Sequence, residues 1–174
     1  MRSTARDFRR LARVAWLLFA ALLPSWHIGA TSFPKADLVV VEKGDRKLHL
    51  MKNGEILRTF RIALGIVPVG DKVEEGDFRT PEGRYILDAR NPNSDYFLSI
   101  HVSYPSRQDI LEAQARGVNP GGAIMIHGLP NEPSRSELYY RTQDWTNGCV
   151  AVSNSDMIDI WLMTPDHTPI EIRP

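Results

Sequence analysis

Short runs of apolar and β-branched residues, separated by turn residues, recur through most of this chain and favour strands over long helices. Residues 38–41 form an apolar β-branched run, and residues 47–51 alternate between polar and apolar side chains. Asn53 and Gly54 follow, and Asn-Gly is the strongest short signal for a hairpin. Because residues 56–64 continue the same pattern, the sequence predicts a three-stranded meander here.

The later part of the chain predicts more strands and a few short helices. Ser106 and Asp109 form a capping box at the start of one helix, and Gly117 is a suitable stop for it. A short helix is expected over residues 134–141, and another after Ser153. A turn is expected at residues 91–94, and further strands at residues 84–88, 96–104, 123–127, 150–152 and 168–172. With about eight strands and two or three helices, the sequence predicts one mainly β domain.

The N-terminal residues 1–30 have a different character. Five arginines precede an apolar run at residues 14–23, and Pro24 and a small Gly29-Ala30 pair follow it. This is the layout of a secretory signal peptide, and the apolar run is shorter than the ~20 residues that span a bilayer. We therefore expect an exported protein of the periplasm or cell envelope. An uncleaved signal anchor is the alternative, and only then would the protein contact a membrane.

The charge balance argues against nucleic acid as a partner. The chain has a formal net charge of zero, with 21 basic and 21 acidic residues. Residues 1–30 hold five of the basic and one of the acidic residues, so the remainder holds 16 and 20, a net charge of −4. Nucleic-acid binding needs a clustered basic face instead.

The single cysteine is the strongest candidate for chemistry. Because Cys149 is the only cysteine, the chain cannot form an internal disulfide. A single thiol in an oxidising compartment is a liability unless it is buried or has a function. His127 ends an apolar run and is the candidate general base that would take the thiol proton. A small buried hydrophobic cysteine is the alternative interpretation.

The residues around the cysteine can complete an acyl-transfer site. Gly148 allows a sharp turn, so the N–H groups of Gly148 and Cys149 are candidate oxyanion donors. Thr146 and Asn147 could orient this loop through bonds to the backbone. A third group should hold the histidine tautomer, and the candidates are the carbonyl of Gly128 and the side chains of Ser103 and Asp144.

Other candidate sites are fewer. Residues 65–83 form a long loop rich in glycine, proline and charge, a type of loop that is often functional, although a plain connection is the alternative. One cysteine and five scattered histidines give no pair of ligands at zinc spacing. There is also no phosphate loop and no dinucleotide fingerprint, so we expect neither a metal nor a cofactor.

His127-Gly128, a polar insertion and then residues 146–152 together resemble the signature of the L,D-transpeptidase catalytic-domain family, the YkuD-like domain. The resemblance covers residues 36–173 and implies a β-sandwich-like fold. It also implies a bacterial envelope enzyme that attacks the peptidoglycan stem-peptide bond between a diamino acid and D-alanine. The acyl group would pass through a cysteine thioester to the amine of another stem, to a lipoprotein lysine or to water.

The resemblance also implies roles for individual residues. Cys149 would be the nucleophile, His127 the proton donor and acceptor, and Gly128 the orienting carbonyl, with oxyanion donors from the backbone of residues 147–149. The substrate-binding candidates are Thr146, Arg79, Ser99 and Tyr104.

Two positions depart from the family pattern. Asn147 stands where the family usually has histidine, and Ala151 where it usually has arginine. The interval between His127 and Cys149 is also slightly long. This Asn-Gly-Cys variant resembles the subgroup that includes enzymes releasing lipoprotein from peptidoglycan, so hydrolysis is an alternative to transfer.

Three functions therefore stand side by side. The first is a transpeptidase that cross-links or remodels the cell wall, and the second is an L,D-carboxypeptidase or amidase that uses water. Cross-linked dimers from a disaccharide tetrapeptide would support the first, and tripeptide alone the second. The third is an envelope module that binds glycan or protein without catalysis, which Cys149→Ala would leave unchanged.

Overall fold

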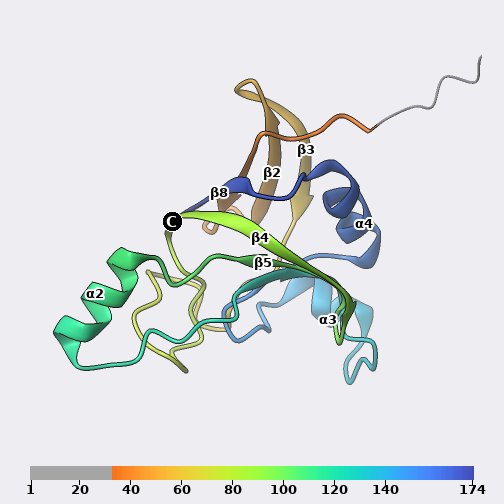
Figure 1. The fold of residues 1–174 in the computed structure, drawn as a ribbon. Coiled ribbons are helices and arrows are strands. Elements are labelled where there is room, and N and C mark those ends of the chain that lie inside the picture. The colour runs from red at the N-terminus through yellow and green to blue at the C-terminus, as the bar shows by residue number, and fades with distance from the viewer. Residues whose placement is uncertain (1–32) are drawn as a thin grey trace, which may run out of the picture. The chain divides into compact units, whose positions relative to one another are not determined.

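The computed structural model describes residues 33–174, so the predicted signal segment lies outside the described residues. Eight strands and three helices follow one another in it (Figure 1). In chain order they are β1 (Leu38–Glu42), β2 (Lys47–Lys52), β3 (Glu55–Arg61), β4 (Gly83–Ser94), β5 (Phe97–Val102), α2 (Arg107–Arg116), β6 (Met125–His127), α3 (Glu137–Thr142), β7 (Val150–Ala151), α4 (Asn154–Met163) and β8 (Thr168–Arg173). The prediction of a mainly β domain with two or three short helices is confirmed.

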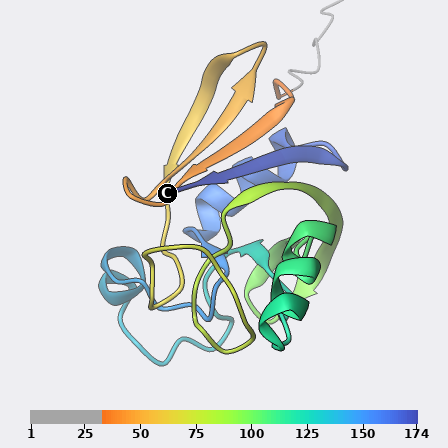
Figure 2. The ribbon, with the colours of Figure 1, turned by 90° about the vertical axis from the view of Figure 1, so that its left-hand side faces the viewer.

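All eight strands belong to one hydrogen-bonded sheet with the order β3-β2-β1-β8-β4-β5-β6-β7. The pairs β1–β8 and β6–β7 are parallel, and the others are antiparallel. β3 and β7 stand at opposite edges of this order, yet Ala63, just after β3, exchanges two backbone bonds of 2.8 Å with Ala151 of β7. The sheet therefore curls until β7 meets the chain just after β3, and the strong bend of β4 in Figure 2 follows this curl.

The core fills the space inside the curl. β8 shows the alternation that a half-buried strand requires, because Thr168, Ile170 and Ile172 are buried while the residues between them face outward. Met157 and Ile160 of α4 are fully buried against the same core. Among residues 33–174, no helix has both the length and the apolar character needed to cross a membrane.

The predicted turn chemistry is confirmed at two places. Asn53 and Gly54 have φ values of 51° and 83° and join β2 to β3, as a tight hairpin turn with two left-handed residues requires. Ser106 and Asp109 form the complete capping box of α2, and Gly117 ends the helix in the left-handed conformation at φ 72°.

The turn predicted at residues 91–94 was wrong. These residues continue β4, and the chain reverses at Asp95 and Tyr96 instead. Pro92 is tolerated because the β4–β5 register is irregular there and β8 pairs only with the earlier part of β4. The longer strand carries its tip, from Asn91 to Tyr96, to the candidate site described next.

Candidate active site

The parallel pair β6–β7 places Cys149 and His127 on the same side of the sheet. Ile126 lies opposite Val150 in the register and His127 opposite Ala151, so Cys149 lies one step before β7 at the level of Met125. Ile126 and Val150 point into the core. Because side chains alternate along a strand, His127 and Cys149 face the other side. There they line one cavity of about 340 Å³.

The His127 ring is oriented by its own neighbour. Its Nδ1 lies 2.7 Å from the Gly128 carbonyl oxygen, which can only accept, so Nδ1–H donates and Nε2 keeps its lone pair. Of the three groups proposed to hold this tautomer, the carbonyl of Gly128 is the one in place. Ser103 instead accepts a bond from the Ile86 N–H, and Asp144 pairs with Arg46.

Burial keeps both members of the pair uncharged. His127 is 4% exposed, and burial lowers its pKa to about 4 despite the bond to Gly128. Burial also raises the pKa of the Cys149 thiol, against smaller opposing effects of the Met125 N–H and the Lys72 charge. The resting pair is therefore a thiol with a neutral imidazole, and Nε2 is free to act as a base.

The loop before the cysteine is held by one hydroxyl group. Thr146 Oγ1 accepts a bond of 3.1 Å from the Gly148 N–H and donates one of 2.8 Å to the Cys149 carbonyl. The predicted role of the Gly148 amide as an oxyanion donor therefore needs correction, because this N–H is already used. Within residues 33–174 the N–H groups of Asn147 and Cys149 find no acceptor and remain the available donors.

A residue with a side chain cannot replace Gly148 without strain and a close contact. The φ of Gly148 is +127°, and a Cβ on it would lie 2.6 Å from the backbone oxygen of Arg79. Arg79 thus contributes its main chain to the support of the nucleophile loop. Its guanidinium lies 3.3 Å from the Asp71 carbonyl and does not line the cavity, so its predicted contact with substrate does not follow from this structure.

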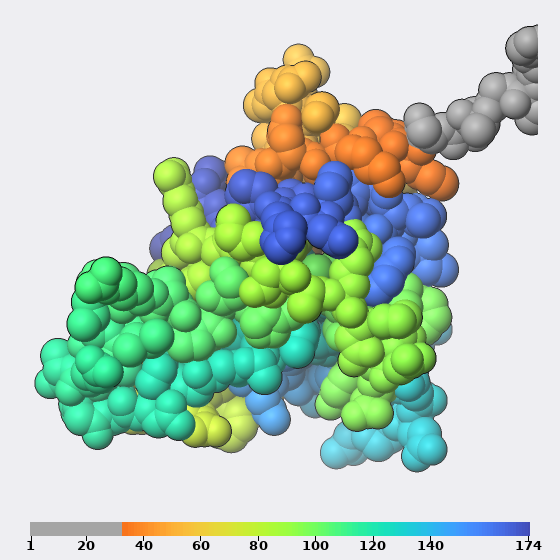
Figure 3. All heavy atoms as spheres, in the orientation of Figure 1, coloured from red at the N-terminus to blue at the C-terminus, as the bar shows by residue number. Residues whose placement is uncertain are grey.

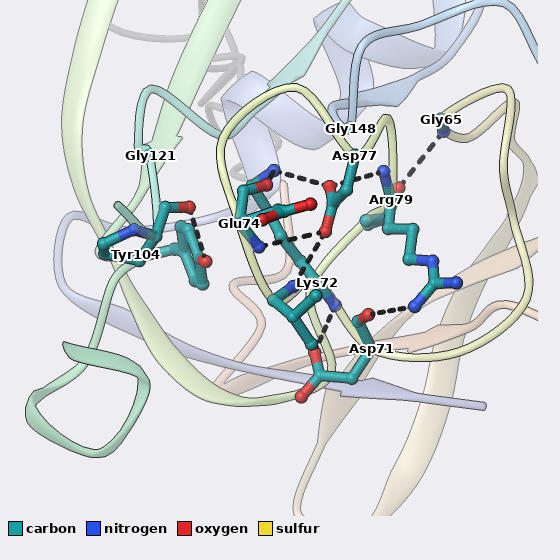
Figure 4. Close-up of polar contacts among 12 residues, drawn as sticks. Gly65, Asp71, Lys72, Glu74, Asp77, Arg79, Tyr104, Gly121 and Gly148 are labelled. Carbon is teal, nitrogen blue, oxygen red and sulfur yellow. Dashed lines mark hydrogen bonds and ion pairs between the residues drawn. The ribbon is translucent and has the colours of Figure 1, made fainter. Parts of the chain in front are cut away.

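Hydrogen bonds and an ion pair within the loop of residues 65–83 hold it in one conformation behind Gly148 (Figure 4). The Asp77 carboxylate accepts bonds from Lys72 Nζ at 2.8 Å and from the Val73 and Arg79 N–H groups at 2.8 and 3.0 Å. Burial raises the pKa of Asp77, but these bonds outweigh it and lower the pKa overall. The carboxylate stays charged and holds the loop behind Gly148.

Of the other predicted contacts, Ser99 and Thr146 line the cavity and Tyr104 does not. Ser99 of β5 lies opposite His127 in the β5–β6 register. Tyr104 is buried, its hydroxyl donates to the Pro120 carbonyl at 2.9 Å, and its ring packs edge-on against Tyr85. The prediction that Tyr104 binds substrate was therefore wrong, because the side chain is used inside the protein.

An aromatic pair beside His127 was not predicted. The Tyr96 ring lies 4.6 Å from the His127 ring, and the Trp145 ring lies 5.6 Å from it on an edge-on contact. Trp145 adjoins the cysteine motif in the sequence and could have been suspected on that ground. Tyr96 was assigned to a strand and not to a turn, so its approach to His127 depends on where β4 ends.

The described residues contain no group of three His, Cys, Asp or Glu side chains placed to hold a metal ion. Cys149 and His127 both line the cavity and are its candidates for chemistry. This arrangement can perform nucleophilic attack by sulfur on a carbonyl carbon, with proton transfer through the imidazole.

Comparison with known proteins adds a family. The family model described as "L,D-transpeptidase catalytic domain" (YkuD) matches residues 36–172. Among curated proteins, YafK of Escherichia coli (strain K12), whose name places it among the L,D-transpeptidases, is 32% identical over 96 residues. The match covers 52% of this chain and 37% of YafK.

Two solved structures share the fold. Pgp2 from Campylobacter jejuni, described as a helical cell shape determining protein, has a TM-score of 0.58 and 27% identity over 78% of this chain and 46% of its own. Bd1075 from Bdellovibrio bacteriovorus has a TM-score of 0.54 and 25% identity over 83% of this chain and 50% of its own. The chain thus spans about a third of the length of YafK and about half the length of these two proteins.

Proposed function

Because the chain belongs to the L,D-transpeptidase catalytic-domain family, we propose that it is a cysteine acyltransferase acting on peptidoglycan stem peptides. The observation that carries the proposal is the placement of Cys149 and His127 on one cavity, with Nδ1 of the imidazole held by Gly128. A histidine fixed in this tautomer presents its bare Nε2 as a base for the thiol.

The first half of the reaction forms a thioester. The Cys149 thiol gives its proton to His127 Nε2 as sulfur attacks the carbonyl carbon of the donor stem. The tetrahedral oxyanion is stabilised by the N–H groups of Asn147 and Cys149, each donor of this kind being worth ~3 kcal/mol in other acyl-transfer enzymes. The C–N bond then breaks, and the amine of the leaving D-alanine takes the proton from Nε2.

The second half regenerates the enzyme. An amine or a water molecule attacks the thioester carbon and gives its proton to Nε2, and the S–C bond breaks. Nε2 then returns the proton to the thiolate. An amine gives a cross-link or an attachment to a lipoprotein lysine, and water gives hydrolysis. The likeness to Pgp2 supports a role in cell-wall remodelling and cell shape, in the periplasm or envelope to which the predicted signal segment would send the protein.

Intact-protein mass spectrometry with a disaccharide tetrapeptide tests the proposal. We expect the wild type to gain the mass of the donor stem minus D-alanine, with the modification on Cys149. Cys149→Ala should gain nothing, and His127→Ala should acylate at least a hundredfold more slowly, since general acid–base catalysis contributes ~10²–10⁴-fold. Cross-linked dimers in the same reaction indicate transfer, and tripeptide alone indicates hydrolysis.

A matched histidine serves as the control. His101 lies on β5, bonds to Asp88 at 2.6 Å and does not line the cavity. His101→Ala should therefore acylate at the wild-type rate. A mass gain in Cys149→Ala, or none in the wild type, would refute the proposed function.

A further inference from the structure

The segment that leads to the nucleophile is fastened by the side chain of Asp144. One of its carboxylate oxygens accepts a bond of 2.9 Å from the Leu64 N–H. The Arg46 guanidinium donates to both oxygens, at 3.1 and 3.0 Å from Nε and at 2.7 Å from Nη2. The side chains of Arg46 and Asp144 are 26% and 18% exposed, so solvent screens their attraction less than that of a surface pair. A charge-assisted, forked pair of this kind fixes both distance and direction.

Backbone bonds carry this fixed point to the cysteine. The N–H groups of Trp145 and Thr146 donate to the Leu64 carbonyl at 3.2 and 3.0 Å. The Thr146 carbonyl accepts from the Ile66 N–H at 3.1 Å, and the Thr146 hydroxyl donates to the Cys149 carbonyl at 2.8 Å. The proposed oxyanion donors, at positions 147 and 149, therefore lie three and five residues beyond the point that Asp144 fixes.

Arg46 is itself held in the turn between β1 and β2. Its Nη1 donates to the Lys43 carbonyl, and its own carbonyl accepts from the Ile62 N–H at 3.1 Å. The Lys43 N–H donates to the Arg173 carbonyl at 3.0 Å, so β8 also supports the turn. Figure 3 shows the chain of β1 and β2 in orange above β8 in blue, as the pairing of β1 with β8 requires.

The same turn also fastens the loop of residues 65–83. The Lys43 side chain is 2% exposed. Its Nζ donates to the Gly70 and Thr80 carbonyls at 2.6 and 2.8 Å and to the Glu82 carboxylate at 2.8 Å. Figure 2 shows the turn in orange beside the C-terminus, above this loop. One turn therefore anchors both the loop behind Gly148 and, through its arginine, the loop before the cysteine.

We propose that Arg46 and Asp144 are positioning residues of the acylation step. Neither of them lines the catalytic cavity, so they act through the loop that they hold and not on the substrate. Their pairing keeps the oxyanion donors at positions 147 and 149 directed at the carbonyl under attack. The inference rests on the proposed function and adds to it two residues that are 98 positions apart in the sequence.

The backbone bonds decide what a variant of this pair loses. In Arg46→Gln or Asp144→Asn, the bonds of Trp145 and Thr146 to the Leu64 carbonyl remain, so the segment stays in place and only its charged anchor is lost. The displacement then falls on the oxyanion donors. Alkylation of the thiol by iodoacetamide does not need these donors, because substitution at a saturated carbon develops no carbonyl oxyanion. Acylation and alkylation therefore report separately on the donors and on the thiol.

Acylation by a disaccharide tetrapeptide and alkylation by iodoacetamide, measured in the same variants, test the inference. We expect Arg46→Gln and Asp144→Asn each to lower the maximal rate of Cys149 acylation at least tenfold, a part of the roughly 10²–10³-fold cost of losing one oxyanion donor. The donor concentration that gives half the maximal rate and the rate of alkylation should stay within about twofold of the wild type. The double variant should lose no more than the larger single loss, because the two residues act as a unit.

The same turn offers a matched control. Asp45 and Lys47 flank Arg46 and form an exposed pair at 3.0 Å, so Lys47→Gln should leave the acylation rate unchanged. Arg46→Lys is the milder variant, because it keeps the charge without the planar fork, and its rate should lie between those of the wild type and Arg46→Gln. Urea unfolding of each variant checks that it is folded in the assay.

The outcomes separate the inference from the proposed function. Wild-type acylation rates in both Arg46→Gln and Asp144→Asn would overturn the inference alone. Alkylation that slows by the same factor as acylation would also overturn it, because the loss would then lie in the thiol or in the fold as a whole. A wild type that is not acylated would remove the proposed function and the inference together.

Discussion

His127 is almost wholly buried, and its Nδ1–H is used by the Gly128 carbonyl, so the ring can serve as a base only while Nε2 is unprotonated. The buried surroundings favour that state at neutral pH. The Cys149 thiol is held uncharged by the same effect, because burial raises its pKa. The two residues therefore do not form a permanent ion pair, and the proposed function requires the proton transfer to take place when substrate arrives.

The lowered pKa of His127 predicts a pH-dependent stability. The unfolded chain protonates its histidine near pH 6.5, but the folded protein does so only near pH 4. Between these values the unfolded state binds more protons, so the free energy of unfolding falls as the pH falls, by about 3 kcal/mol for this group. Urea unfolding at pH 7 and at pH 4 would measure the loss. It should be smaller by that amount in His127→Gln, and an equal loss in both proteins would contradict the prediction.

The close packing around Gly148 predicts that adding one methyl group there lowers the rate of acylation strongly. Gly148→Ala must place a Cβ 2.6 Å from the Arg79 backbone oxygen at a φ of +127°, so the nucleophile loop has to shift. We expect acylation to fall by at least a hundredfold, because a misplacement of about 1 Å can cost that much. The measurement is the rate of acyl-enzyme formation.

Gly54→Ala is the matched control, because it tests a positive φ without a close contact. Gly54 has a φ of +83°, and a Cβ on it would meet nothing within 4 Å. Gly54→Ala should lose roughly 1–2 kcal/mol of stability and keep the wild-type rate of acylation. Equal rates in the two variants would show that the contact with Arg79 is unimportant.

At the scale of elements, the loop of residues 65–83 and the loop before Cys149 act as one unit. A Cβ on Gly65 would collide with the backbone of Phe78, and the same glycine lies close to Gly148. Its N–H also donates to the Thr80 hydroxyl at 3.2 Å (Figure 4). The main chains of the two loops therefore pack directly on each other, with glycine at the points of closest approach.

The buried Lys72–Asp77 ion pair predicts how much the loop of residues 65–83 contributes to the free energy of unfolding. The Lys72 side chain is 4% exposed, so Asp77→Asn leaves a buried ammonium without its counter-charge. Breaking a buried pair in this way costs ~3–5 kcal/mol. Urea unfolding should show a loss of roughly 3 kcal/mol. In Asp45→Asn, which breaks the exposed pair with Lys47, the loss should be below about 1 kcal/mol. Similar losses in the two variants would refute a structural role for the buried pair.

At the scale of the whole domain, the site depends on the curl of the sheet. The chain after β3 pairs with both sides of the nucleophile segment, at Ala63–Ala151 and at Gly65–Thr146. Residues 88 and 81 positions apart in the sequence are thereby joined on either side of Cys149. Leu64 takes part too, because its N–H donates to the Asp144 carboxylate at 2.9 Å.

Local patterns in the sequence were sufficient to predict most of the elements and to name a candidate nucleophile and base. Alternating apolar residues, Asn53-Gly54 and the Ser106 capping box act over a few residues, so their physics can be read from a short window. The solitary Cys149 and the strand end at His127 are local features as well. The limit of β4 was misjudged because Pro92 is tolerated only where the neighbouring strand leaves its position unpaired.

The roles of the surrounding side chains were decided by packing between distant segments. The Tyr104 side chain lies in the interior, and the Gly148 N–H donates to the Thr146 hydroxyl. Arg79 lies close to Gly148 through its backbone oxygen and not through its guanidinium. The sequence by itself therefore determined a mainly β domain and singled out Cys149 and His127 as the candidate nucleophile and base. Only the tertiary structure decided which neighbours reach them, because hydrogen bonds and close contacts between segments far apart in the chain exist only once the sheet has curled.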